Sequence, residues 1–140
     1  MSKGPEANFW NQIRANLPPK THATRIENKH GGGVPDVHLA WDGISFWFEL
    51  KICKANAVNI SPHQIAWHMA YFARGGQSFF LVKRSLTREI LLFGGDQGPN
   101  LASGGVSGSE GQVFSGLAPL FCALRPLLLS KVSCALRPDP

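Results

Sequence analysis

The clearest alternation of apolar and polar positions lies in residues 34–51, on both sides of Asp42-Gly43. Asp-Gly between two β-prone runs is the strongest short-range signal for a hairpin with a two-residue type I′ turn. A turn at this place fixes the register, because side chains alternate along a strand, and it sets Asp36 opposite Glu49. One face of the hairpin is then apolar, and the other carries Asp36, His38, Ser45, Trp47, Glu49 and Lys51.

The flanking segments predict the other elements of a small α/β domain. A helix is expected over 5–17, where apolar residues recur at helical spacing until two prolines end it. A second helix is expected from Ser61 to about Arg74, because Ser61 and Gln64 form a capping box. Three further strands are expected over 22–27, 78–84 and 88–93. With the two helices and the hairpin, they give the element order α-β-β-β-α-β, followed by one more strand.

Composition divides the chain into three parts. Residues 1–93 hold the predicted core elements, and residues 94–112 are rich in glycine and serine, which predicts a loop or linker. Residues 113–140 are apolar again, but their prolines and basic residues argue against a membrane span. We expect this extension to form two short helices that pack on the core, with a contact to a partner subunit as the alternative.

Charge and cysteine content narrow the functional classes. A chain of 140 residues suits one small domain, and its net charge of +5 favours nucleic acid over a membrane as partner, although many basic proteins bind nothing acidic. Three cysteines without a Cys-x-x-Cys pair argue against a disulfide framework or a zinc knuckle. With no apolar signal region at the start, a cytoplasmic protein is expected, from a bacterial or archaeal cell or a phage-infected host.

Asp36 and Glu49 are the candidate catalytic acids. Carboxylates directly opposite on neighbouring strands lie about 5 Å apart and destabilise the sheet, so fold stability alone does not explain them. A divalent cation between them would, and Mg²⁺ prefers one or two carboxylates together with water and substrate phosphate. Lys51, on the same face as Glu49, is placed to hold a phosphate oxygen or to help deprotonate the attacking water. The plainer alternative is a solvated face on which Lys51 neutralises an acid.

These residues resemble the PD-(D/E)xK nuclease superfamily, whose pattern stands here as Pro35-Asp36 and Glu49-Leu50-Lys51. The likeness runs to about residue 84 and also takes in Glu6, Arg25-Ile26-Glu27, Gly33, Ser61 and Gln64. It is greatest to the archaeal-type Holliday-junction resolvases and the VRR-NUC nucleases, which are often phage-encoded. The resemblance implies an α/β, restriction-endonuclease-like core, in which a mixed β-sheet is flanked by helices.

The resemblance also implies the cofactor and the roles of the site residues. Asp36, Glu49 and the backbone carbonyl of Leu50 are expected to hold Mg²⁺, for which Mn²⁺ can substitute. Lys51 is expected to orient the attacking water or to stabilise the developing charge.

Two further residues are assigned to the site by the resemblance. Glu6 is expected to supply an additional acid from the first helix, with Glu27 as the alternative, and Gln64 is expected beside the acids. A favourable charge at a helix N-terminus accounts equally well for Glu6, and the capping box accounts for Gln64.

Six residues are candidate contacts to the DNA backbone. Residues 28–33 form a basic, glycine-rich loop that leads directly into Asp36, and glycine permits close backbone approach to a ligand. The plainer alternatives are a flexible turn for the loop, an ion pair with Glu27 for Arg25, and simple solvation for Lys54. The candidates are Arg25, Lys29, His30, Gly32, Gly33 and Lys54.

The resemblance implies a metal-dependent, structure-specific DNA endonuclease, and first a Holliday-junction resolvase that cuts branched four-way DNA as a homodimer. A VRR-NUC-type repair nuclease or a restriction-like nuclease acting on flaps or linear DNA is the first alternative. A DNA-binding module without catalytic activity is the alternative from another class.

Overall fold

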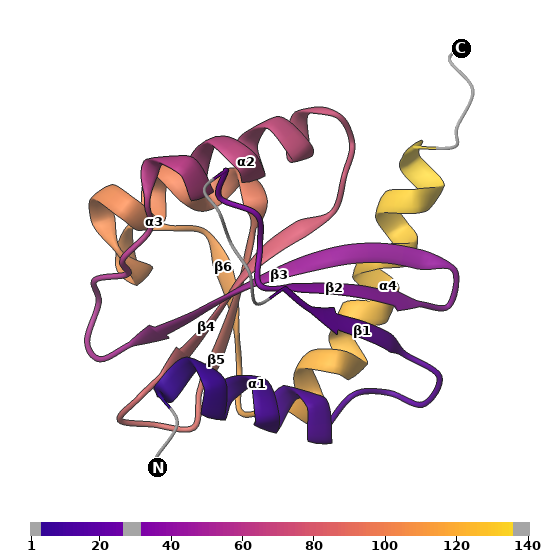
Figure 1. The fold of residues 1–140 in the computed structure, drawn as a ribbon, viewed down its shortest axis with the longest axis horizontal. Coiled ribbons are helices and arrows are strands. Elements are labelled where there is room, and N and C mark those ends of the chain that lie inside the picture. The colour runs from indigo at the N-terminus through magenta and orange to yellow at the C-terminus, as the bar shows by residue number, and fades with distance from the viewer. Residues whose placement is uncertain (1–3, 27–31, 136–140) are drawn as a thin grey trace.

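The computed structural model describes residues 4–26 and 32–135, which form one sheet with helices on both of its faces (Figure 1). The elements in chain order are α1 (Pro5–Ala15), β1 (His22–Arg25), β2 (Val37–Trp41), β3 (Ile44–Cys53), α2 (Pro62–Ala73), β4 (Ser78–Arg84), β5 (Ile90–Gly94), η1 (Gly95–Gln97), α3 (Gly98–Gly104), η2 (Val106–Gly108), β6 (Gly111–Phe114) and α4 (Leu117–Ala135). The six strands lie in sequence order across the sheet.

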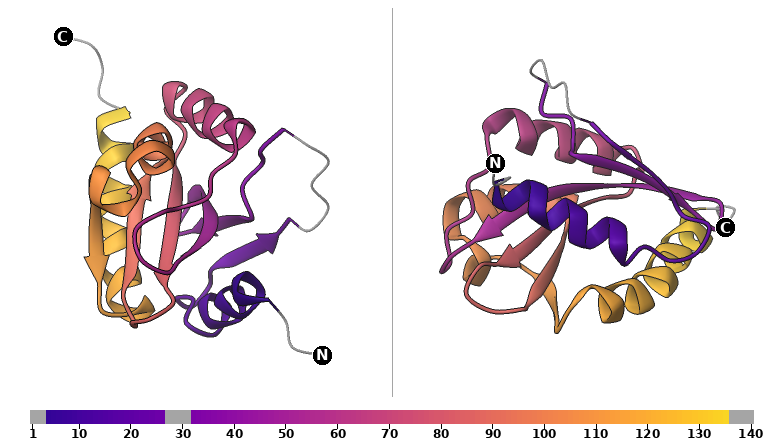
Figure 2. Two further views of the ribbon diagram at one scale, coloured as in Figure 1. Left: turned by 90° about the vertical axis from the view of Figure 1, so that its left-hand side faces the viewer. Right: turned by 60° about the horizontal axis from the view of Figure 1, so that its bottom comes forward.

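The sheet is mixed, because β3 and β4 run parallel while the other neighbouring pairs run antiparallel. The chain must cross from the end of β3 to the start of β4, and α2 makes this crossover, as parallel strands require. Helices α2 and α3 cover one face of the sheet, and α1 and α4 cover the other (Figures 1 and 2). The predicted α/β class, the mixed sheet and the order α-β-β-β-α-β are confirmed.

The predicted hairpin is confirmed in turn type and in register. Asp42 and Gly43 have φ angles of 51° and 78°, and a type I′ turn requires positive φ at both of its central residues. Trp41 pairs with Ile44, as a two-residue loop demands, and the pairing continues along β2 and β3. The apolar set therefore faces the core, and the polar set faces the side of α2.

Two apolar clusters lie on opposite faces of the sheet. The larger one joins α1 and α4 to the sheet, and its fully buried members include Phe9, Phe46, Phe48, Leu81, Leu120 and Leu124. The smaller one lies under α2 and α3 and includes Phe80, Val82, Leu91, Phe93, Leu101 and Val106. The polar face of the hairpin lies beside the smaller cluster, so the candidate site sits next to α2.

Residues 94–112, expected as a loop or linker, instead hold short helices and the start of an edge strand. Leu101 and Val106 are 0% and 8% exposed and anchor this segment in the smaller cluster. Asn56 also holds this segment in place, because the backbone carbonyl of Asn56 accepts a hydrogen bond of 2.9 Å from Val106 N–H. Two apolar anchors and one asparagine thus order a stretch whose average composition predicts no structure.

The C-terminal extension packs on the core as a single helix, α4, rather than as two short ones. Leu120, Leu124 and Leu128 recur at intervals of four and lie buried in the larger cluster. Pro126 lies inside the helix, on its exposed side. Within the described residues, the helices are all too short or too polar to cross a membrane.

Candidate active site

The register of β2 and β3 carries Asp36 and Glu49 to facing positions. Val37 pairs with Phe48 in the last β2–β3 pair, and Asp36 and Glu49 are the next residues along the two chains. Both carboxylates are buried, at 7% and 2% exposed. The hairpin register thus brings two buried acids to neighbouring strands, and like charges at facing positions destabilise a sheet.

The side chain of Asp36 is held in one orientation by a hydrogen bond from the backbone of β3. Its Oδ2 accepts a hydrogen bond of 2.7 Å from the backbone N–H of Leu50, in a buried position. Strand β2 begins at Val37, so the aspartate side chain binds a β3 donor beyond the end of the β2–β3 backbone pairing. One carboxylate oxygen is thereby committed to the scaffold, which pre-organises the acid pair.

Lys51 joins β3 to α2 at the same site. Its Nζ donates to Gln64 Oε1 at 3.0 Å, and the same oxygen accepts the backbone N–H of Ser61 at 3.0 Å. Ser61 Oγ in turn accepts from Gln64 N–H at 3.1 Å, which completes the predicted capping box. The two interpretations of Gln64 are thus compatible, because the cap holds the amide oxygen where it meets the lysine.

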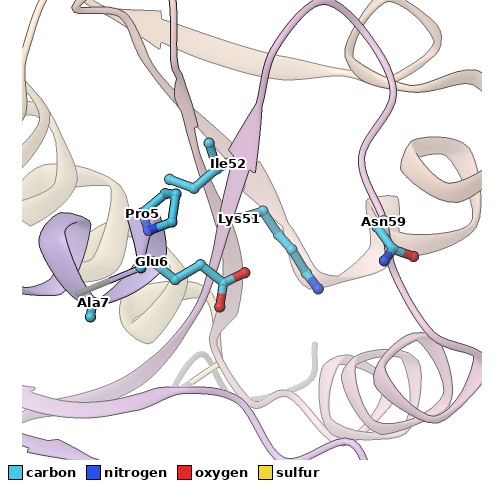
Figure 3. Close-up of a pocket in the computed structure, with 7 residues that line it drawn as sticks. Pro5, Glu6, Ala7, Lys51, Ile52 and Asn59 are labelled. Atoms are coloured by element: carbon cyan, nitrogen blue, oxygen red, sulfur yellow. The ribbon is translucent and has the colours of Figure 1, made fainter. Parts of the chain in front are cut away.

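Glu6 and Lys51 both line a pocket of about 390 Å³, whereas Asp36 and Glu49 are not among its lining residues. Figure 3 shows the Glu6 and Lys51 side chains entering this pocket from α1 and β3, with Asn59 beyond the lysine. Among the described residues, no group of three or more His, Cys, Asp or Glu side chains is arranged to hold a metal ion. Glu6 as an additional acid therefore stays a prediction, with the pocket as its place.

His68 is a buried residue on α2 that is not among the candidates singled out from the sequence. It is 0% exposed, its ring lies 4.1 Å from the ring of Phe80, and its Nδ1 lies 2.8 Å from Ser78 Oγ. Its Nε2 is buried and has no hydrogen-bond partner among the described residues. In the sequence, its place near the site is indicated only by its position four residues after Gln64, which puts both residues on one face of α2.

Burial lowers the pKa of His68 from 6.5 to about 4, with the Asp36 charge opposing this shift and the Lys51 charge adding to it. The folded protein therefore binds fewer protons here than the unfolded chain between pH 6.5 and 4. We expect the full contribution of neutral His68 to the free energy of unfolding above pH 6.5. As the pH drops from 6.5 to 4, the free energy of unfolding should fall by about 3 kcal/mol because of this residue. Urea unfolding across this range should show the loss in the wild type, and His68→Gln should show a correspondingly flatter profile. Equal profiles would contradict the assignment.

The two described loop glycines differ in their surroundings. Gly33 has a φ of 70°, and a Cβ at this position would lie 2.1 Å from the backbone oxygen of His63. Gly33 is thus required for the segment before Asp36 to pack on the first turn of α2. Gly32, with a φ of 79°, has no atoms within 4 Å of a Cβ built there. A DNA contact by either glycine stays a prediction.

Of the other candidate DNA contacts, the structure describes Arg25 and Lys54. Arg25 pairs with Val37 and so shares the face of the sheet that carries the larger cluster, opposite the acids. Lys54 is exposed just after β3. Glu27, Lys29 and His30 lie outside the described residues.

Comparisons with known proteins give a likeness of structure alone. No family model matches the chain, and a search of curated proteins gives no match either. Among solved structures, the chain is similar to Hjc from Archaeoglobus fulgidus, a Holliday junction resolvase from an archaeal hyperthermophile. The TM-score is 0.47 at 13% sequence identity, and the match covers 65% of this chain and 74% of that one.

Proposed function

We propose that this chain is a divalent-metal-dependent DNA endonuclease with Asp36 and Glu49 at its centre. The observation that carries the proposal is the pair of buried carboxylates on adjacent strands, with one held by Leu50 N–H. Lys51 follows Glu49 by two residues on the same face. An arrangement that repels itself, yet is fixed by the scaffold, fits a site for a cation and a phosphate.

The donor set fits Mg²⁺ better than a closed zinc site. Mg²⁺ takes one or two carboxylates and keeps several waters, whereas a structural zinc site needs four protein ligands. Asp36 and Glu49 would hold the ion, with the backbone carbonyl of Leu50 as the third protein ligand, and Mn²⁺ would substitute. When bound, such an ion neutralises phosphate charge and makes water more acidic.

The chain's own residues supply positioning and charge. Lys51 Nζ, which donates to Gln64 Oε1, would also donate to a non-bridging phosphate oxygen and stabilise the negative charge that grows in the transition state. In the hydrolysis, a water oxygen bonds to phosphorus while the bond to the leaving sugar oxygen breaks. The water loses one proton, and the leaving oxygen gains one.

The first substrate to test is branched DNA. Wild-type protein should be incubated with a labelled four-way junction, a flap and a linear duplex of matched sequence, in Mg²⁺ and in EDTA. Paired symmetric nicks in the junction alone, lost in EDTA, would identify a resolvase acting as a homodimer. Cleavage of the flap or the duplex would keep the endonuclease and change its substrate. Binding without cleavage of any of the three would contradict the proposal and leave a DNA-binding module.

Gln64 should affect cleavage beyond its effect on stability. Gln64→Ala removes both the partner of Lys51 and one half of the capping box, whereas Ser61→Ala removes only a cap bond. We expect each variant to lose about 1 kcal/mol of stability, and Gln64→Ala alone to slow cleavage by about 10–100-fold. Initial rates at a temperature where both variants are folded would test this. A similar rate for the two variants would leave Gln64 as a cap only.

A further inference from the structure

Four aromatic side chains form a row beside the acid pair. We name this row the aromatic shelf, and its members are His38, Trp47, Trp67 and Tyr71. The rings of His38 and Trp47 lie 4.8 Å apart, and those of Trp47 and Trp67 lie 5.5 Å apart. Trp67 stacks on Tyr71 at 4.8 Å with an angle of 24° between the ring planes. The row thus crosses from β2 over β3 to α2.

The shelf continues the line of the acids along the same face of the sheet. His38 follows Asp36 by two residues, and Trp47 precedes Glu49 by two. Because side chains alternate along a strand, the rings and the carboxylates point to one side, about 7 Å apart along each strand. A phosphate at the acid pair therefore has the base of a neighbouring nucleotide within reach of the shelf.

The shelf is not part of the hydrophobic core. Neither apolar cluster includes its four side chains, and each of the four is only half-buried. Tyr71 also packs closely against Gly76, since a Cβ at Gly76 would lie 2.4 Å from its ring. Rings that are held in place yet partly open to solvent present a pre-formed stacking surface.

An unpaired base fits this surface better than a paired one. Aromatic side chains stack on the faces of unpaired bases, whereas the faces of bases inside a duplex are covered by their neighbours. Arg74 is exposed three residues after Tyr71, and the net charge of +5 suits a phosphate backbone. We propose that the aromatic shelf binds an unpaired DNA base beside the phosphate that is cut. The choice of DNA rests on the proposed function.

Binding assays in EDTA test the shelf without any need for cleavage. Trp67→Leu should weaken binding of a single-stranded oligonucleotide by about 10-fold or more, and should change the affinity for a duplex of the same sequence by less than about two-fold. Trp67→Phe keeps a ring and should retain most of the affinity. Trp41→Leu is the matched control, because Trp41 packs against Phe121 on the opposite face.

Fluorescence gives a second readout that leaves the shelf intact. The chain has four tryptophans, so replacing Trp10 and Trp41 with Phe leaves only Trp47 and Trp67 to report. Single-stranded DNA should quench this signal and duplex DNA should not. Equal quenching by both, or an equal loss of both affinities in Trp67→Leu, would overturn the proposal. Selective binding of single-stranded DNA without any cleavage would support the aromatic shelf as a base-binding surface. It would contradict only the proposed nuclease activity.

Discussion

Replacing Glu49 with Gln will lower the rate of DNA cleavage by at least about 1,000-fold. The amide keeps the shape of the side chain and removes the charge that would hold the cation opposite Asp36. Loss of the outer hydrogen-bond partners of a metal ligand already costs about 10–100-fold, so loss of the ligand itself should cost more. Initial rates in Mg²⁺ on the best of the three substrates would measure the effect.

The matched control is Glu110→Gln, which removes one exposed carboxylate just before β6, at the far edge of the sheet. It should cleave at the wild-type rate, and both variants should bind DNA in EDTA about as well as the wild type. A Glu49→Gln protein that is folded and cleaves within about 10-fold of the wild type would remove Glu49 from the catalytic machinery.

Gly33→Ala will destabilise the fold by about 2–4 kcal/mol. The new methyl group meets the His63 carbonyl, which is backbone and cannot turn away, and alanine is also strained at a φ of 70°. The steric part is worth about 1–3 kcal/mol and the backbone part about 1 kcal/mol. Relief requires a shift of the first turn of α2, which carries Gln64 and through it the position of Lys51. Urea unfolding would give the stability change.

Gly32→Ala separates the two causes. Its φ of 79° imposes a similar backbone strain, but its Cβ would have open space. We expect a loss of about 1 kcal/mol and a cleavage rate near that of the wild type for a protein that is folded. Equal stability losses in the two variants would show that the contact with His63 does not constrain the loop.

The sequence predicts the hairpin and its acids well because the signals there are local. The Asp42-Gly43 turn fixes the register, and the register alone brings Asp36 to Glu49 across the strands. The capping box likewise needs only Ser61 and Gln64, three residues apart. Each of these features depends on a few neighbours in the chain, so no long-range contact has to be guessed.

The remaining features depend on contacts between segments that are distant in the chain. Asn56 orders residues near 106, and the sequence around either gives no sign of the other. The sequence gives no sign that Gly33 lies against the backbone of His63 in the first turn of α2. The pKa of His68 is depressed only because folding buries its ring, with the Lys51 charge adding to this shift and the Asp36 charge opposing it. Single-sequence patterns carry none of this information.

The most direct test of a metal site at Asp36 and Glu49 is Mn²⁺ binding. The electron paramagnetic resonance signal of the free ion would measure how much Mn²⁺ is bound. We expect that wild-type protein binds Mn²⁺, that Mg²⁺ competes for the same site, and that Glu110→Gln behaves like the wild type. The double variant Asp36→Asn, Glu49→Gln should lose this binding while its unfolding transition stays cooperative. Equal Mn²⁺ binding by the wild type and the folded double variant, or none by either, would contradict a metal site at the acid pair.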